Sequence, residues 1–147
     1  MNVYVGVTDW NWYQYLRDHR MTEVNFWKPS GQSFKALHEG DLFLFKLKTA
    51  HGGIIAGSGF FVNTSITSID WAWRAFGTEN GVNNLAELSD IIWHYKGGNG
   101  HRNPNANLTC IILTDVFYLN ETDWIDISTQ WSPSIVTGKT FHGQEAA

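Results

Sequence analysis

The sequence contains little cysteine and no long apolar run. Cys110 is the only cysteine among 147 residues, so no intrachain disulfide can form. No apolar run approaches the roughly 20 residues that a membrane-spanning helix needs, and the N-terminus lacks a secretory signal pattern. We therefore expect a cytoplasmic protein that folds without disulfides and does not associate with membranes.

Charge is also scarce, and it is unevenly distributed. Charged residues make up 16% of the chain, and the formal net charge is −4. Residues 1–102 contain nine Lys/Arg and nine Asp/Glu, whereas residues 103–147 contain Lys139 and five acidic residues. This balance excludes a protein that coats polyanions indiscriminately. It also predicts that an anionic partner contacts the first two-thirds of the chain.

Motifs for catalysis and for metal binding are missing. The chain has no Gly-x-Ser-x-Gly elbow, phosphate-binding glycine loop or dinucleotide fingerprint. Cys110 lies in an apolar segment, where a cysteine behaves as a small, inert hydrophobic residue. His94 and His101 have no cysteine pair or His-Glu partner that would complete a zinc site. We therefore expect no catalytic residue, no metal and no cofactor.

The length predicts one domain over residues 1–147. The order of its predicted elements, β-α-β-β-α-α-β-β, indicates the α+β class, with a strongly bent mixed sheet flanked by helices. The paired glycines Gly57 and Gly59 predict a bulge or bend in one strand. Strands are expected at 2–7, 41–48, 53–62, 108–119 and 124–127, with an extended tail at 134–141. The segment 24–31 is expected to turn from a strand into a loop that contains Trp27. Helices are expected at 10–20, 69–76 and 85–95, with one or two helical turns at 33–37.

Aromatic residues reach 15% of the chain and carry the strongest functional signal. We interpret Trp71, Trp73, Trp93 and Trp124 as core residues. A second set lies at predicted strand ends among polar residues: Trp10, Trp12, Phe26 and Trp27, beside Asp9, Asn25, Lys28, Pro29 and Ser30. Such a mixture suits a planar heterocycle, because stacking stabilises a bound base by about 1–3 kcal/mol and polar groups can contact the ring edge. Sugars stack on tryptophan as well, so composition does not separate a base from a sugar.

Asp9 has two interpretations. It follows the first predicted strand and precedes the first predicted helix, which is the position of an N-cap. It also lies beside the aromatic set, where a carboxylate can accept a hydrogen bond from an exocyclic amine or a ring N–H.

The order of several motifs resembles the PUA superfamily, which includes EVE, YTH, ASCH and SRA domains. The EVE-like segments are Val3–Trp10, Val24–Gly31, Gly40–Lys46 and Gly53–Gly59. The chain is most similar to the domain that precedes an HNH nuclease in prokaryotic modification-dependent restriction endonucleases. That similarity rests on Asp9-Trp10, 24–30, 43–46, 59–61, Trp71, 75–77, 80–81, 124–125 and 138–140.

The resemblance implies a PUA-like bent sheet or pseudo-barrel that binds nucleic acid and has no catalytic activity. It implies that a modified base, such as 5-methylcytosine in double-stranded DNA, is flipped into an aromatic pocket. In this interpretation the chain is an EVE/SRA-like specificity module of prokaryotic defence. Residues 1–147 contain no nuclease domain, so a covalently linked or separate nuclease is the expected partner.

This interpretation assigns two sets of residues. The base pocket is expected to contain Asp9, Trp10, Asn25, Phe26, Trp27 and Lys46. The nucleic-acid backbone is expected to contact Lys28, Ser30, Lys35, Lys48, Arg74 and Arg102. Two alternatives remain open: a small-molecule or carbohydrate-binding module, and an ASCH-like hydrolase of a modified nucleoside with Lys46 and Asp9 as its acid/base pair.

Overall fold

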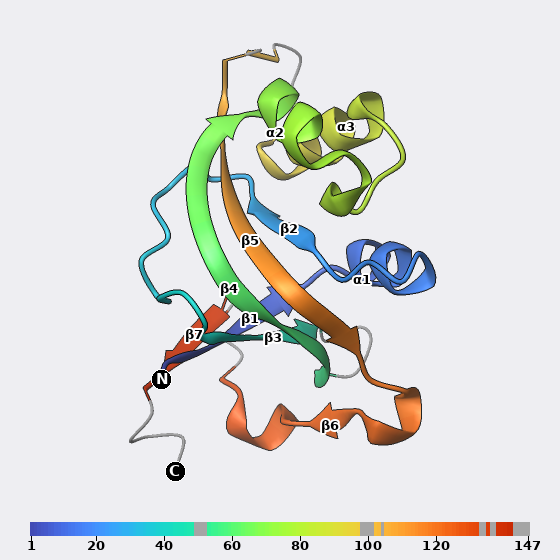
Figure 1. Cartoon of the computed structure of the whole chain (residues 1–147), viewed down its shortest axis with the longest axis vertical. Helices are drawn as coiled ribbons and strands as arrows, with labels where there is room; N and C mark the ends of the chain where they lie inside the picture. Colours follow the sequence, from blue (N-terminus) through green and yellow to red (C-terminus); the bar gives the residue numbers. More distant parts are fainter. Residues whose placement is uncertain (49–52, 98–101, 104, 133–134, 136–137, 143–147) are drawn as a thin grey trace.

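The computed structural model describes residues 1–48, 53–97, 102–103, 105–132, 135 and 138–142. The strands and helices, in chain order, are β1 Val3–Thr8, α1 Trp10–Asp18, β2 Val24–Lys28, β3 Leu42–Leu47, β4 Ile54–Ser68, α2 Ile69–Phe76, α3 Leu85–Tyr95, β5 Asn107–Tyr118, β6 Ile125–Asp126 and β7 Gly138–Phe141 (Figure 1). Short 3-10 turns occur at Gly77–Asn80 (η2), Glu121–Asp123 (η3) and Ser128–Gln130 (η4). No helix in these ranges is long and apolar enough to cross a membrane.

All seven strands belong to one bent, mixed sheet, which confirms the predicted α+β class. The strand order is β2-β5-β4-β3-β1-β7, with β6 paired to β4. β1 and β3 are parallel, whereas β1–β7, β2–β5, β3–β4, β4–β5 and β4–β6 are antiparallel. β4 and β5 form a long curved pair, with α2 and α3 at one end and β1, β3 and β7 toward the other (Figure 1).

The bend in β4 confirms the prediction drawn from its glycines. The β4–β5 register shifts twice, between Ser58 and Phe60 and between Phe61 and Asn63. A Cβ atom on Gly57 would lie 2.5 Å from the carbonyl oxygen of Phe117, so the two strands approach too closely for any side chain there. Bulges and glycines increase local twist, and here they turn β4 from one half of the sheet to the other.

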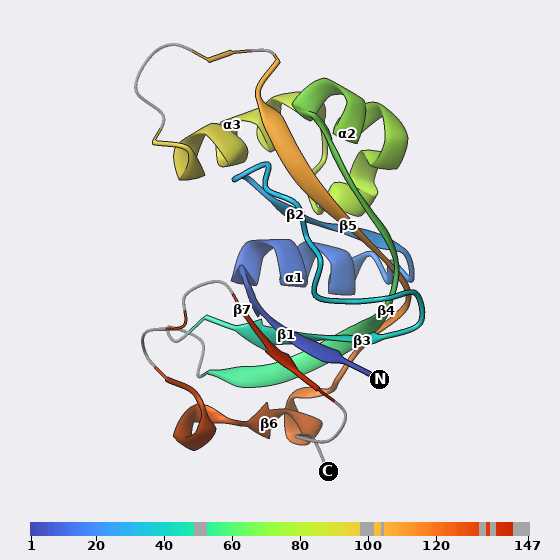
Figure 2. The ribbon, with the colours of Figure 1, turned by 90° about the vertical axis from the view of Figure 1, so that its left-hand side faces the viewer.

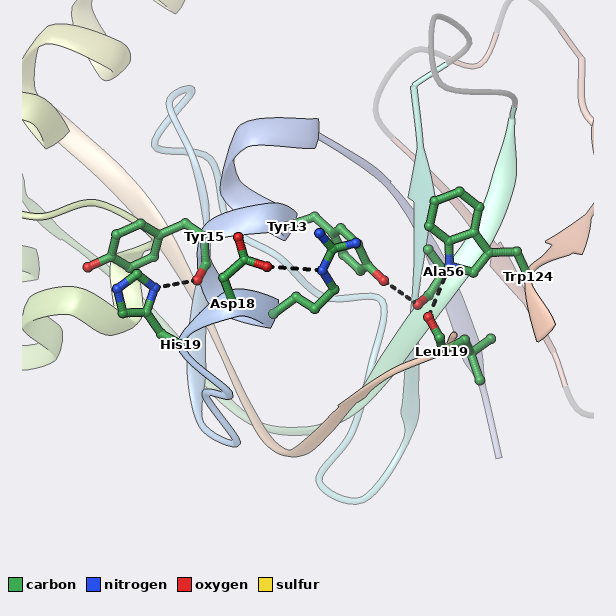
Figure 3. Close-up of polar contacts among 8 residues, drawn as sticks. Tyr13, Tyr15, Asp18, His19, Ala56, Leu119 and Trp124 are labelled. Atoms are coloured by element: carbon green, nitrogen blue, oxygen red, sulfur yellow. Dashed lines mark hydrogen bonds and ion pairs between the residues drawn. The ribbon is translucent and has the colours of Figure 1, made fainter. Parts of the chain in front are cut away.

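Two hydrophobic cores pack along this bent sheet. In the first core, Tyr13 and Leu16 of α1 are buried against Phe43 and Phe45 of β3. The Tyr13 hydroxyl donates a hydrogen bond of 2.8 Å to the carbonyl of Ala56 on β4, which fixes α1 on the sheet (Figure 3). The second core, formed by Ile69, Ala72, Val82, Leu88, Ile92, Leu108 and Cys110, joins α2 and α3 to β5. Figure 2 shows α1 between the α2–α3 pair and strands β1 and β3.

The three helices begin where the sequence predicts. Asp9, Ser68 and Asn84 cap α1, α2 and α3, each accepting a hydrogen bond from a backbone N–H in the first turn. These bonds satisfy donors that a helix N-terminus otherwise leaves unpaired. The interpretation of Asp9 as a helix cap is therefore confirmed.

Three local predictions are wrong. Residues 33–37 form no helical turn, because Phe34 packs edge-on against Tyr4 at 5.0 Å and Leu37 is buried, which holds this segment extended across the core. Trp27 lies in β2 and not in a loop. Trp71 is not a core residue: it is 61% exposed, with the Arg74 guanidinium 5.2 Å from its ring.

Candidate functional site

A pocket of about 590 Å³ lies where β2 ends, between the start of α1 and the end of α3. Its aromatic lining consists of Trp12, Phe26, Trp27 and Tyr95. The volume is within the range of about 300–1,000 Å³ that is typical of small-ligand pockets. Successive β2 residues face opposite cores, since Phe26 packs in the first core and Trp27 also contacts the second. The pocket therefore forms at the junction of the two cores.

A buried amide network holds Trp27 in the pocket wall. The Trp27 indole Nε1 donates to the carbonyl of Asn80 at 2.9 Å. The Asn80 side chain is fully buried, and its Nδ2 donates to the carbonyls of Ala72 and Gly77 at 3.0 and 2.9 Å. Its Oδ1 accepts from Asn25 Nδ2 at 2.9 Å. The turn η2 thereby fixes the orientation of an aromatic side chain on β2.

Trp12 forms the floor of the pocket beneath Gly81. Trp12 packs edge-on against Phe26 and Phe45, with ring centroids 5.2 and 5.4 Å apart. A Cβ atom at Gly81 would collide with the indole of Trp12, and its φ of +83° lies in the left-handed region that favours glycine. Close approach of the turn after η2 to α1 therefore requires glycine at this position.

Three polar side chains from distant segments meet at the pocket. Asp9 Oδ1 accepts from the Tyr95 hydroxyl at 3.2 Å and lies 3.7 Å from Lys48 Nζ. Lys48 Nζ donates to the Tyr95 hydroxyl oxygen at 3.0 Å. Asp9 Oδ2 accepts from the backbone N–H of Trp12 at 3.2 Å, so one carboxylate caps α1 and also joins the ends of β3 and α3. We call Asp9, Lys48 and Tyr95 the polar triad.

The polar triad keeps Lys48 charged. Burial lowers the pKa of Lys48, but the hydrogen bond that Lys48 donates to the Tyr95 hydroxyl and its electrostatic interactions with Tyr95 and Asp9 outweigh that effect, and the pKa is raised overall. An ammonium group donates hydrogen bonds and accepts none. At neutral pH Lys48 is therefore suited to binding an acceptor or an anion, and poorly suited to act as a free-amine base.

Asp9→Asn separates the helix-capping role of Asp9 from its role in ligand binding at the pocket. Asparagine caps helices as well as aspartate does, and the ion pair with Lys48 is partly exposed, so we expect the free energy of unfolding to change by less than about 1 kcal/mol. Because asparagine adds an N–H donor where the carboxylate only accepts, we expect the ligand preference of the pocket to change.

Urea denaturation and a binding panel of modified and unmodified oligonucleotides measure these two effects. A destabilisation above about 2 kcal/mol would make the carboxylate chiefly structural, since a lost cap costs at most that much. An unchanged preference would leave Asp9 as a helix cap alone.

The structure brings together half of the residues predicted for the base pocket. Asp9, Phe26 and Trp27 line it, and so do three residues predicted for the nucleic-acid backbone, namely Lys28, Ser30 and Lys48. Of the other backbone candidates, Lys35 is exposed in the loop before β3, Arg74 lies over Trp71, and Arg102 forms an ion pair of 2.7 Å with Asp90.

Trp10, Asn25 and Lys46 are not among the residues that line this pocket. Trp10 packs against Tyr13 and Trp124 on the sheet side of α1. Asn25 is fully buried, and its Oδ1 accepts from the backbone N–H of Ile111 at 3.2 Å in addition to the bond to Asn80.

Lys46 does not pair with Asp9, and this corrects the acid/base pair proposed for an ASCH-like hydrolase. Lys46 is only 4% exposed, with its Nζ 4.8 Å from the ring centroid of Trp131. The β3–β4 register shifts between Phe45 and Lys46, and β3 ends at Leu47, so strand alternation does not determine where the two lysines point. Lys48 is the lysine that meets Asp9.

Lys46→Met is expected to stabilise the protein. Burial lowers the pKa of Lys46, so the folded state carries a desolvated cation at neutral pH. Replacing such a charge by a methionine of similar shape should raise the free energy of unfolding by about 1 kcal/mol, even though the contact with Trp131 is lost.

The stability difference between wild type and Lys46→Met should depend on pH, because the pKa of Lys46 is lowered in the folded protein. The unfolded chain keeps the lysine proton up to its ordinary pKa of 10.5, whereas the folded protein releases it earlier. Wild type should therefore gain stability relative to the variant as alkaline pH approaches that value. Urea denaturation at several pH values measures the free energies of unfolding of wild type and variant. A difference between them that stays constant or grows as the pH rises would contradict this account.

Sequence reasoning missed Tyr95 as a site residue. Leu85, Leu88, Ile91, Ile92 and Tyr95 share one predicted helix face, which indicates a core role for all five. Tyr95 is instead 44% exposed and ends α3 beside the pocket. Its position in the last turn of the helix is the only signal in the sequence that separates it from the core residues.

Comparisons with known proteins identify the fold. No family model matches the sequence, and no curated protein matches it. The structure is similar to the ASCH protein from Zymomonas mobilis, with a TM-score of 0.67, 9% identity, and coverage of 98% of this chain and 90% of that chain. Two single-substitution variants of that protein give TM-scores of 0.66 and 0.67, also at 9% identity, with 98% of this chain and 93% and 91% of theirs covered. The chain therefore has the PUA-like fold that ASCH domains share.

Proposed function

We propose that this protein is a nucleic-acid-binding domain that takes a single base into the pocket beside β2. The observation that carries this proposal is the combination, in one pocket, of an aromatic lining with the polar triad. PUA-like neighbours agree with such a role at the level of fold. The raised pKa of Lys48 keeps this group an ammonium, which can donate hydrogen bonds to a bound ligand.

The chemistry of the pocket matches that of a nucleobase. Trp27 and Tyr95 lie with ring centroids 6.3 Å apart and planes at 62°, so they offer two aromatic surfaces in different orientations. Asp9 supplies an acceptor for an exocyclic amine, and Lys48 supplies a donor for a ring nitrogen or carbonyl oxygen. A cytosine or adenine edge presents this pattern of donor and acceptor groups.

The finer proposal is that the base is a modified cytosine flipped out of duplex DNA. It is supported by the resemblance to the domains that precede HNH nucleases, and by the need for a base to leave the stack before it can enter a pocket. In that role the domain supplies specificity to a nuclease on the same or a separate chain.

Base flipping makes a specific prediction for duplexes. Extruding a base costs a few kcal/mol, and the cost falls when the base is mismatched or single-stranded. We therefore expect a mismatch opposite the modified cytosine to preserve or increase affinity. The fluorescence of 2-aminopurine placed beside the target should rise on binding, because stacking is lost.

The test is a titration of methylated, hydroxymethylated, glucosylated and unmodified duplexes, each paired or mismatched at the target cytosine, with free sugars and nucleosides as competitors. Competition by a simple sugar but by no nucleoside would favour the carbohydrate-binding alternative. Weaker binding to the mismatch, with no change in 2-aminopurine fluorescence, would mean that an intact duplex is bound without flipping.

A second candidate function is hydrolysis of a modified nucleoside. It is favoured by the direct contacts among a carboxylate, an ammonium and a phenol in the polar triad, with Lys48 in the place expected for Lys46. Incubation with N-acylated and N-alkylated nucleosides, followed by chromatography, tests it. Product formed by wild type and abolished in Asp9→Ala would establish this activity in place of simple binding.

A further inference from the structure

We propose that Lys28 binds a phosphate of the strand whose base enters the pocket, so that the pocket accepts a phosphorylated nucleotide unit in preference to a neutral nucleoside or sugar. This inference rests on the proposed function. It adds an anion subsite, on a different part of the lining from the polar triad, and it names the chemical class of the occupant.

The ammonium of Lys28 is held in place by two aromatic rings. Its Nζ lies 5.0 Å from the ring centroid of Tyr4 and 5.3 Å from that of Phe34. These two rings pack edge to face at 5.0 Å. Nζ also donates a hydrogen bond of 2.8 Å to the Tyr4 hydroxyl. Attraction of a cation to ring faces and one hydrogen bond orient the group without neutralising it.

The side chain of Tyr4 is itself held in place by packing against β3 and β7. It is 6% exposed and packs against Phe43 on β3 with centroids 5.2 Å apart. A Cβ atom at Gly138 of β7 would collide with the Tyr4 hydroxyl, so the close pairing of β7 with β1 confines the phenol. Strands β1, β2 and β7 thus contribute to the position of one ammonium group.

Lys28 is a cation without an acidic partner among the residues that the structure describes. Asp9, the carboxylate in the pocket lining, interacts with Lys48 and caps α1. An ammonium has three N–H donors, and the bond to Tyr4 uses one of them. Lys28, which is one of the residues lining the pocket, therefore carries a positive charge that no acidic side chain among the described residues compensates, in a chain whose net charge is −4.

A nucleic-acid phosphate fits this arrangement better than a neutral group does. Charge-assisted hydrogen bonds to phosphate are roughly twice as strong as neutral ones, and partial burial of Lys28 reduces screening by water and salt. Pro29 and Ser30 follow Lys28 along the pocket lining. A strand that passes over them would have its base on Trp27 and a phosphate at Lys28.

The experiment pairs a ligand change with a protein change. The probes are single-stranded trinucleotides, thymidine–5-methyldeoxycytidine–thymidine, with either natural linkages or uncharged methylphosphonate linkages on both sides of the central base. They are titrated into wild type, Lys28→Met, Lys28→Arg and, as a matched control, Lys139→Met, which removes an exposed lysine that does not line the pocket. Thermal unfolding checks that every variant is folded.

We expect the methylphosphonate probe to bind wild type and Lys139→Met about tenfold more weakly than the natural probe, as the loss of one charge-assisted hydrogen bond predicts. Lys28→Met should bind both probes equally, and Lys28→Arg should retain most of the difference. Equal binding of both probes to wild type, or a full difference in Lys28→Met, would overturn the inference while leaving base binding intact. Binding of neither probe to any variant would overturn the proposed function as well.

Discussion

Trp27→Ala is expected to weaken the binding of a modified oligonucleotide strongly and to destabilise the fold. Loss of one base stack costs about 1–3 kcal/mol, or roughly 5- to 150-fold in affinity. Trp27 also packs in both cores and bonds to Asn80, so truncation should lower the free energy of unfolding by about 3 kcal/mol. Fluorescence titration and urea denaturation measure the two losses.

Two further variants separate binding from stability at this position. Trp27→Phe keeps an aromatic surface but removes the indole N–H that bonds to Asn80, so it should lose stability while retaining part of the affinity. Trp71→Ala removes an exposed tryptophan that does not line the pocket and should change neither quantity appreciably. Wild-type affinity in a folded Trp27→Ala variant would remove Trp27 from the binding site.

Asn80→Ala is the second substitution with a large expected effect. It would leave the carbonyls of Ala72 and Gly77 without their side-chain donor and the buried amide of Asn25 without its oxygen acceptor. Each buried polar group left unpaired costs about 1–3 kcal/mol. We therefore expect a loss of at least about 3 kcal/mol in the free energy of unfolding, with weakened ligand binding because the support of Trp27 is disturbed.

Asn83→Ala is the matched control for this variant. Asn83 is exposed and its amide bonds to Glu87 at 3.3 Å, so its loss should change stability by less than about 1 kcal/mol. Urea denaturation and hydrogen exchange of the α2–α3 backbone measure the effects. Equal stability of the two variants would show that the Asn80 network does not hold the second core on the sheet.

Because the pocket lies where β2 ends, this short strand affects both the stability of the fold and ligand binding. β2 has five residues, yet its side chains alternate between the two cores, with Phe26 in the first and Asn25 in the network of the second. Lys28, the last residue of β2, follows in the direction of Phe26 and reaches Tyr4. Function at this site therefore depends on packing in both cores.

The sequence by itself determined the α+β class and the bounds of two helices. Local patterns predict α2 at 69–76 and α3 at 85–95 with the same bounds that the structure has, and Asp9 caps α1 as expected. These features depend on neighbours within a few residues, such as a side-chain oxygen beside free N–H groups. The adjacency of Asp9 to aromatic residues was likewise sufficient to indicate a polar, aromatic pocket.

The tertiary structure alone decided which side chains meet in that pocket. Lys48 and Tyr95 join Asp9 from 39 and 86 positions away, and no local pattern relates them. Lys46, two residues before Lys48, lies against Trp131 because the β3–β4 register shifts beside it. Side-chain direction at the end of a strand depends on such shifts and on the packing of neighbouring elements, whereas sequence alternation holds only while the strand remains regular.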